Sequence, residues 1–167
     1  NMSRFSKIII FAAAMVMAAA CSSKAGIEGE LTGAASSEVV MKLLNINQYQ
    51  VLDTVKTNAS GKFSYKVEVA KGQPEFVYVF YKDRKVASLL LEAGDKVSVQ
   101  TDTLGNSVVE GSEESVKLAS VESDFAKAKA AMADAAASGE QLSRTYVDYY
   151  RSRVEYVMKN NRSLTVV

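Results

Sequence analysis

The segment from Ile27 to about Glu110 consists of short β-branched and aromatic runs separated by turn residues. In KFSYKVEV, residues 62–69, Phe63, Tyr65, Val67 and Val69 fall on alternate positions, so they share one face of a strand. The residues between them are charged or polar and suit a solvated face. Regular short runs of this kind predict antiparallel sheet, with strands at Ile27–Thr32, Val39–Leu44, Gln50–Thr57, Lys62–Val69, Phe76–Lys82, Val86–Glu92, Lys96–Thr101 and Ser107–Glu110.

Two connections in this segment carry residues that tolerate positive φ angles. They are NASG, residues 58–61, and EAGD, residues 92–95, and both are typical of hairpin turns. The strands on either side of each turn are therefore expected to be antiparallel neighbours. The runs FVYVFY (76–81) and SLLL (88–91) lack clean alternation, which predicts central strands buried on both faces.

The chain changes character after Gly111, where alanine becomes the commonest residue. Ser112 suits a helix N-cap, and Glu113 and Glu114 follow where the helix dipole favours acidic groups. The first helix carries an apolar stripe of Leu118, Val121, Phe125, Ala128 and Met132, and Gly139 ends or interrupts it. A second helix is expected at about Glu140–Asn160, with Val147, Tyr150, Val154 and Val157 on one stripe, widened by Tyr146 and Tyr149. Two antiparallel helices would bury these stripes on each other or on the sheet.

The first twenty residues have the pattern of a signal peptide. Arg4 and Lys7 precede the uncharged, almost wholly apolar run 8–20, which is too short to span a bilayer. The small residues that a signal peptidase requires before its cut are Ala18, Ala19 and Ala20. Cys21 follows directly and is the only cysteine of the chain.

These residues resemble a bacterial lipoprotein signal, in which the cysteine takes a diacylglyceryl group and becomes the acylated mature N-terminus. The resemblance implies lipidation at Cys21 and a membrane partner reached through that lipid. It departs at Ala18, where such signals usually carry leucine or a similar branched residue. An ordinary secretory signal with an incidental cysteine is the alternative, although secreted chains rarely keep a lone free thiol. A buried structural cysteine fits less well, because 22–26 is a polar tether.

Removal of residues 1–20 leaves 147 residues, enough for one domain or a small domain with an appendage. The chain has 20 basic and 19 acidic residues, and two basic residues leave with the signal, so the remainder is nearly neutral. That balance gives no electrostatic case for nucleic acid. The expected organisation is a signal peptide at 1–20, an anchor tether at 21–26, an antiparallel β domain at 27–111, a two-helix region at 112–160 and a chain end at 161–167. The end is expected to lead into a further domain or to form a final strand.

Five segments carry a second resemblance: IEGELTG (27–33), VLDTVKTNASGKFSYKVEV (51–69), KVASLLLEAGDKVSV (85–99), VVEGSEES (108–115) and YVMKNNRSLTVV (156–167). They resemble a family of domains of unknown function in lipoproteins of Gram-negative anaerobes, usually N-terminal to thioredoxin-like domains of the AhpC/TSA or TlpA/ResA type. The resemblance does not bring redox activity to this chain, because that activity resides in a Cys-x-x-Cys motif that the chain lacks.

The residues leave little room for catalysis. The chain contains no histidine, and Cys21 is assigned to the anchor, which excludes Ser-His and Cys-His triads and the usual zinc sites. No cofactor or metal is expected. The carboxylate pairs are Glu92 with Asp95 and Glu113 with Glu114. Each pair has an ordinary turn or cap role, which we favour strongly over acid–base catalysis.

Two tripeptides, DTV (53–55) and DTL (102–104), resemble the Asp-Ser/Thr-apolar sequence at which some of these anaerobes O-glycosylate exported proteins. Thr54 and Thr103 are therefore candidate glycosylation sites, against the structural alternative of a strand-end hydrogen bond or cross-strand pair. Asn58 begins an N-glycosylation pattern, which a bacterial envelope argues against. The tyrosines Tyr146, Tyr149, Tyr150 and Tyr156 crowd one helix, and helix-on-sheet core is the favoured interpretation over a partner or saccharide surface.

Together these patterns predict a mainly β fold with α: an antiparallel β-sandwich-like domain followed by a C-terminal helical hairpin. We expect a non-catalytic, lipid-anchored envelope module that binds a protein or glycan partner or spaces a partner from the membrane. The absence of Asp after Cys21 favours the outer membrane, facing the periplasm, with the cell surface as the alternative. A second hypothesis is that the chain is the N-terminal region of a longer thiol-disulfide oxidoreductase. A third, least favoured, is that it is a hydrolase that uses carboxylates and tyrosine.

Overall fold

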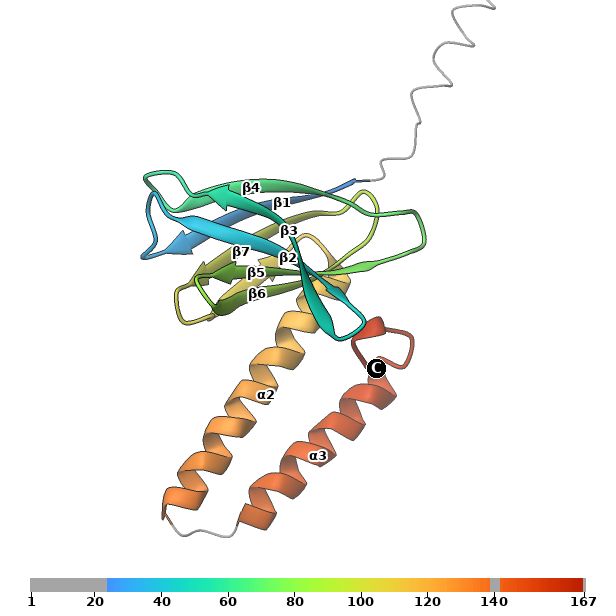
Figure 1. The fold of residues 1–167 in the computed structure, drawn as a ribbon. Helices are drawn as coiled ribbons and strands as arrows, with labels where there is room; N and C mark the ends of the chain where they lie inside the picture. The colour runs from blue at the N-terminus through green and yellow to red at the C-terminus, as the bar shows by residue number, and fades with distance from the viewer. Residues whose placement is uncertain (1–23, 139–141, 167) are drawn as a thin grey trace, which may run out of the picture.

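The computed structural model of the protein describes residues 24–138 and 142–166, and within them eight strands precede a helical hairpin (Figure 1). The strands are β1 (Lys24–Thr32), β2 (Glu38–Asn45), β3 (Gln48–Lys56), β4 (Lys62–Glu68), β5 (Glu75–Tyr81), β6 (Arg84–Leu91), β7 (Lys96–Asp102) and β8 (Ser107–Glu110). The helices are α2 (Glu113–Ser138), α3 (Leu142–Lys159) and the short 3-10 helix η1 (Leu164–Val166). The predicted anchor and cleavage residues Ala18–Cys21, and Gly139, lie outside the described residues.

The strands form two four-stranded sheets, in the orders β4-β1-β7-β8 and β3-β2-β5-β6. Neighbouring strands are antiparallel except β1 and β7, which are parallel. The predicted fold class, a mainly β sandwich-like domain followed by a C-terminal helical hairpin, is confirmed. Every predicted strand is present, and its ends differ from the prediction by three residues or fewer.

A single apolar core fills the space between the two sheets. One sheet contributes Ile27, Leu31 and Val99, and the other contributes Met41 and Val79, all essentially inaccessible to solvent. The alternation predicted for β4 is present, because Phe63 and Val67 are buried and Tyr65 is half-buried, while Ser64 and Lys66 between them are exposed. Burial of this apolar area is the main favourable term in folding the sandwich.

The predicted hairpins at NASG and EAGD are wrong. Asn58–Gly61 leads from β3 in one sheet to β4 in the other, and Glu92–Asp95 leads from β6 to β7, again across the sandwich. Gly61 and Gly94 do have positive φ, at 77° and 95°, so the local turn chemistry was interpreted correctly. Turn residues reverse the chain but do not select the partner strand, which the shared core decides.

Antiparallel hairpins form instead at β2–β3, β5–β6 and β7–β8. The β7–β8 turn has Gly105 at φ 94°, whereas the other two turns use residues less typical of positive φ. β2 and β3 pair through a two-residue turn at Ile46–Asn47, where Ile46 has φ 59° and is 93% exposed. β5 and β6 pair around Lys82, at φ 53°. A β-branched residue is rarely found at positive φ, so the sequence of the first turn gives no hairpin signal.

The prediction that β5 and β6 are buried on both faces is confirmed for most of their length. β6 is nevertheless an edge strand, and the beginning of α2 covers it. The Leu90 amide donates to Ser115 Oγ at 3.0 Å, and that hydroxyl donates to the Leu90 carbonyl at 2.7 Å. One serine thus satisfies both backbone groups of Leu90 at an edge that would otherwise be open to pairing with another chain.

The predicted helix start is confirmed, because the Ser115 amide donates to Ser112 Oγ at 3.4 Å, as in an N-cap. The helices project from the sandwich and run side by side (Figure 1). The prediction that both apolar stripes are buried is wrong. In α2, Leu118, Val121, Ala128 and Met132 are half-buried, whereas Phe125 is exposed. In α3 the predicted stripe faces solvent, because α3 contacts α2 through a different side and no sheet lies against it in the described structure.

Candidate binding surface on the helical hairpin

The side of α3 that meets α2 is polar and aromatic rather than aliphatic. Its half-buried residues are Thr145, Tyr149, Arg153 and Tyr156, which recur at three- and four-residue steps. Tyr149 packs against Phe125 of α2 with ring centroids 6.1 Å apart, and the Arg153 guanidinium lies 5.0 Å from the Tyr156 ring. This choice of contact side turns the aliphatic side of α3 outward.

The apolar side of α3 that faces outward, the outer stripe, is defined by Tyr146, Val147, Tyr150, Val154, Val157 and Met158. Their exposed fractions lie between 39% for Val157 and 74% for Met158. At 3.6 residues per turn these residues occupy about 120° of the helix circumference, so they form one continuous surface. Tyr146 and Tyr150 add a 3.0 Å hydroxyl–hydroxyl hydrogen bond and ring centroids 4.7 Å apart. The tyrosines of this stripe are therefore not helix-on-sheet core.

The outer stripe is large enough to matter energetically. Its six side chains expose on the order of 500 Å² of mostly apolar area, since an aromatic side chain can bury about 150–250 Å². The largest contiguous apolar patch on a monomeric protein is typically about 300–600 Å², and such a patch is often functional. The surface is therefore suited to contact with an apolar partner.

A hydrogen-bonded clasp fixes the base of the hairpin to the start of α2. Glu114 Oε2 accepts from Ser163 Oγ at 2.7 Å and from the Leu164 amide at 3.1 Å, and Lys117 Nζ lies 3.0 Å from Oε1. Partial burial favours a higher pKa for Glu114, but these donors outweigh burial and lower its pKa below the ordinary value. The clasp therefore holds the segment that follows α3 against the first turn of α2.

A second attachment joins α2 to β6. Glu122 Oε1 lies 2.6 Å from Lys85 Nζ and accepts from Ser88 Oγ at 2.9 Å. Burial, followed by the proximity of Tyr49 and Glu122, raises the pKa of Tyr78 beneath this attachment to about 12. Tyr78 is therefore neutral at physiological pH and packs edge-on against Tyr49, with ring centroids 5.3 Å apart, on the face of the sheet away from the central core. A neutral, packed phenol does not suit a general base.

A cleft of about 790 Å³ lies where the hairpin meets the β7–β8 turn. Val108, Phe125, Tyr149, Lys127 and Arg153 are among the residues that line it, so its wall is aromatic with a basic rim. It borders the polar contact side of α3 and faces away from the centre of the outer stripe. None of the six outer-stripe residues lines the cleft, so it is a separate feature of the hairpin.

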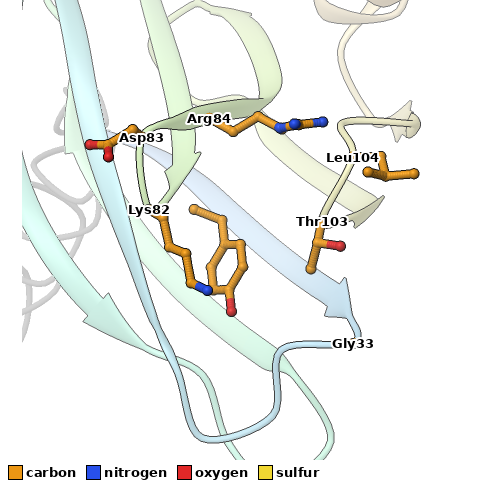
Figure 2. A pocket seen from close by; sticks show the side chains of 7 residues that line it. Gly33, Lys82, Asp83, Arg84, Thr103 and Leu104 are labelled. Carbon is orange, nitrogen blue, oxygen red and sulfur yellow. The ribbon is translucent and has the colours of Figure 1, made fainter.

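A shallower hollow of about 650 Å³ lies at the sandwich between the β5–β6 and β7–β8 turns. Figure 2 shows Arg84 extending toward Leu104, while Asp83 points away from both. Lys82 Nζ lies 5.3 Å from the Tyr81 ring centroid. Thr103 lies in this hollow, half-buried beside Gly33.

The two candidate glycosylation residues lie in different places, Thr54 within β3 and Thr103 in the turn between β7 and β8. Thr54 is exposed on β3, an edge strand, and its amide donates to Asp53 Oδ1 at 2.8 Å. Beside Thr103, Asp102 Oδ1 accepts from the amides of Leu104 and Asn106. The Asn106 side chain first, and then backbone amides, lower the pKa of Asp102. Both aspartates thus have local structural contacts, and modification of the threonines stays a prediction.

In each of the two predicted carboxylate pairs, at least one member has a structural contact. Asp95 Oδ2 accepts from the Glu92 amide at 3.0 Å in the turn between the sheets, and Glu113 pairs with Lys117 at 2.7 Å. Within residues 24–138 and 142–166, no cluster of three or more Asp, Glu, Cys or His side chains has a metal-binding arrangement. Over the same residues, no helix has both the length and the apolar character to cross a bilayer.

Sequence reasoning missed Glu114 and Ser115 as organising residues. The sequence indicates only a helix-dipole role for Glu114. Its contacts with Ser163 and Leu164 span about fifty positions, and no local sequence pattern connects residues so far apart.

A family model described as a domain of unknown function, DUF4369, matches residues 26–118. No curated protein matches the chain. The match covers the sandwich and the beginning of α2, and it ends before the outer stripe.

Proposed function

The chain belongs to the DUF4369 family, and we propose that it is a non-catalytic binding module of the cell envelope, anchored by lipid at Cys21. The single observation that carries the binding role is the outer stripe, an exposed apolar surface on a helix whose polar side faces its own neighbour. Exposing such an area to water is unfavourable, and a partner that covers it gains the corresponding free energy. The proposed partner is a protein, because contact along a whole helix face suits another folded or folding chain better than a small molecule.

The binding role is tested with the native full-length lipoprotein, isolated in mild detergent after cross-linking in cells. Val154 in the outer stripe and Val51 on β3 are both 58% exposed, so Val51→Lys is a matched control for Val154→Lys. We expect a partner to copurify with the wild-type protein and with Val51→Lys, and to be lost with Val154→Lys. Retention of the partner by Val154→Lys, or a clean monomer with its own turnover, would contradict the proposal.

The anchor is tested separately. Cys21→Ala is expected to move the protein from the membrane fraction to the soluble fraction, because lipid chains provide the membrane affinity. The intact mass of the wild-type protein is expected to exceed that of the polypeptide from residue 21 by the mass of the lipid. A mass equal to lipid plus polypeptide alone would exclude glycosylation at Thr54 and Thr103. Protease treatment of intact cells distinguishes the periplasmic side of the outer membrane from the cell surface.

The second candidate is the N-terminal region of a longer thiol-disulfide oxidoreductase. The resemblance of residues 156–167 to the segment that leads into a thioredoxin-like domain favours it, and such a domain would offer a cover for the outer stripe. Reading the gene beyond the codon for Val167 decides between the candidates. An in-frame Cys-x-x-Cys domain would support the second, and a stop codon would remove it.

A further inference from the structure

The outer stripe has the residue spacing of a helix that packs against another helix. Val147, Tyr150, Val154 and Val157 are separated by three, four and three residues, which is the spacing of the a and d positions of a heptad. Both a positions are valine, and β-branched residues there favour pairing of two helices. These four side chains form the seam of the stripe. Each is at least 39% exposed, so no other described part of the chain covers the seam.

The flanks of this seam are basic. Arg144 and Arg151 lie on one side and Arg153 on the other, each about 80–100° from the centre of the outer stripe. Asp148 and Glu155 lie further round the helix, about 120–140° from that centre. Arg151 is 3.6 Å from Asp148, and both are well exposed, so that pair is weak and can rearrange. Within the described residues, neither Arg144 nor Arg153 has an ion-pair partner; the half-buried Arg153 guanidinium lies 5.0 Å from the Tyr156 ring.

We propose that the outer stripe binds an amphipathic helix of a partner protein whose apolar seam is flanked by acidic residues. This inference rests on the proposed binding function and names the chemistry of the partner. Charged residues beside a helical seam select the partner and its orientation, because like charges across the seam repel. With arginine on both sides of the stripe, a partner helix with glutamate or aspartate at its flanks is the complementary one.

A second copy of this chain fits the seam poorly. In an antiparallel pair of α3 helices the residues after the d positions face each other, which brings Arg151 close to its own counterpart. In a parallel pair Arg151 meets Tyr146 and Arg153 meets Met158, so no opposite charges pair across the seam. The basic flanks therefore act against self-association, which is one way in which natural interfaces gain specificity.

A membrane surface also fits less well than a helix. Helices that lie in the interface of a bilayer insert tryptophan, phenylalanine or leucine, and the outer stripe contains none of them. Its valines are short and regularly spaced, which suits the holes of a facing helix.

The test uses two three-heptad peptides with leucine at the a and d positions, one with glutamate and one with lysine at the flanks. Each labelled peptide is titrated with the full-length lipoprotein in neutral detergent, and binding is followed by fluorescence anisotropy. We expect the acidic peptide to bind at least about tenfold more tightly than the basic one, and its affinity to fall as salt is raised.

Charge-reversal variants make the comparison specific to the stripe. The double variant Arg144→Glu with Arg151→Glu is expected to lose roughly tenfold in affinity for the acidic peptide and to gain affinity for the basic one. Lys159→Glu changes a charge on the same helix about 160° from the stripe centre and should leave the preference unchanged. Helix content measured by circular dichroism confirms that each variant remains folded.

Three outcomes would overturn the inference. The first is equal binding of the two peptides. The second is self-association of the lipoprotein that Val154→Lys abolishes, which would assign the stripe to a second copy. The third is binding of the protein with Cys21→Ala to phosphatidylglycerol vesicles, again abolished by Val154→Lys, which would assign it to a membrane. All three outcomes would still leave the stripe as a binding surface. The proposed function itself fails if Val154→Lys changes none of peptide binding, self-association, vesicle binding and partner capture in cells.

Discussion

Gly29 lies opposite Phe63 in the β1–β4 pair, and a side chain at this position has no space. A Cβ atom added to Gly29 would overlap the Phe63 ring, which is itself buried in the core. We expect Gly29→Ala to lower the free energy of unfolding by about 1–3 kcal/mol, the usual cost of overpacking a core. Urea unfolding followed by circular dichroism measures the change.

Gly26 provides the control on the same strand, because nothing lies within 4 Å of a Cβ added there. Gly26→Ala should be neutral or slightly stabilising, since it reduces the entropy of the unfolded chain. Combining Gly29→Ala with Phe63→Leu should cost less than the sum of the two single changes. Equal effects of the two alanine substitutions would show that the ring adjusts without strain.

Ile46 is a second residue whose backbone determines the outcome of a substitution. It has φ 59° in the β2–β3 turn, where a β-branched side chain is strained, and its side chain is almost fully exposed. Asparagine tolerates this conformation, so Ile46→Asn should raise the free energy of unfolding by about 1 kcal/mol. Ile46→Val keeps the branched carbon and should give no gain in the same thermal unfolding experiment. A gain with valine as large as with asparagine would point instead to relief of surface hydrophobicity.

At the scale of elements, the clasp at Glu114 joins η1 to α2 and should respond to acid. The folded-state pKa of Glu114 lies below its ordinary value of about 4.5, so its ionised form contributes stability that is fully present above that pH. The contribution is lost as the pH falls through the folded-state pKa. We expect the end of α3 and η1 to detach in acid while the sandwich remains folded.

Hydrogen exchange at the Leu164 amide reports the clasp directly, because that amide donates to Glu114. Corrected for intrinsic rates, its protection should fall below about pH 4.5 in the wild-type protein. Glu114→Gln should show the lower protection already at neutral pH, with little further dependence on acid. A Leu164 amide that stays equally protected in both proteins across this range would show that other contacts hold η1.

The sequence predicts the elements well and their pairing less well. Alternation in residues 62–69 and the N-cap at Ser112 are local signals, and the structure follows both. The turns at NASG and EAGD fail as hairpin signals, because the same glycine conformation serves a hairpin or a crossing between two sheets. Partner choice depends on which apolar faces meet in the core, and that information is spread over the whole β region.

For the molecule as a whole, the spacing of residues in α3 correctly predicts an apolar stripe, but the predicted burial of that stripe is wrong, because it is exposed to solvent. Val147, Tyr150 and Val154 have the periodicity of a buried helix face, and periodicity cannot state whether the covering surface belongs to the same chain. The contact side of α3 carries Tyr149 and Arg153, which no hydrophobicity pattern would select. The sequence thus identifies the residues of the candidate site by their spacing, and the structure shows that these residues are exposed to solvent.

This arrangement predicts two levels of stability within one chain. The sandwich is held by an extensive core, whereas Ser115 and Ala135 are the buried residues of α2, and none of the described side chains of α3 is buried. Segments with few buried contacts open without global unfolding. We therefore expect native-state hydrogen exchange to show amides of α3 opening at a free energy well below that of β1, β5 and β7, which should exchange with global unfolding.

Occupancy of the outer stripe should then reduce this difference. A helix that covers the stripe stabilises the closed hairpin by mass action, so saturating acidic heptad peptide should slow exchange throughout α3 and leave β5 unchanged. The same peptide added to Val154→Lys should leave α3 exchange as it is in the unbound protein. If α3 in the free protein were as protected as β5, the hairpin would be an integral part of the folded core, and its apolar outer face would have no energetic need for a partner to order it.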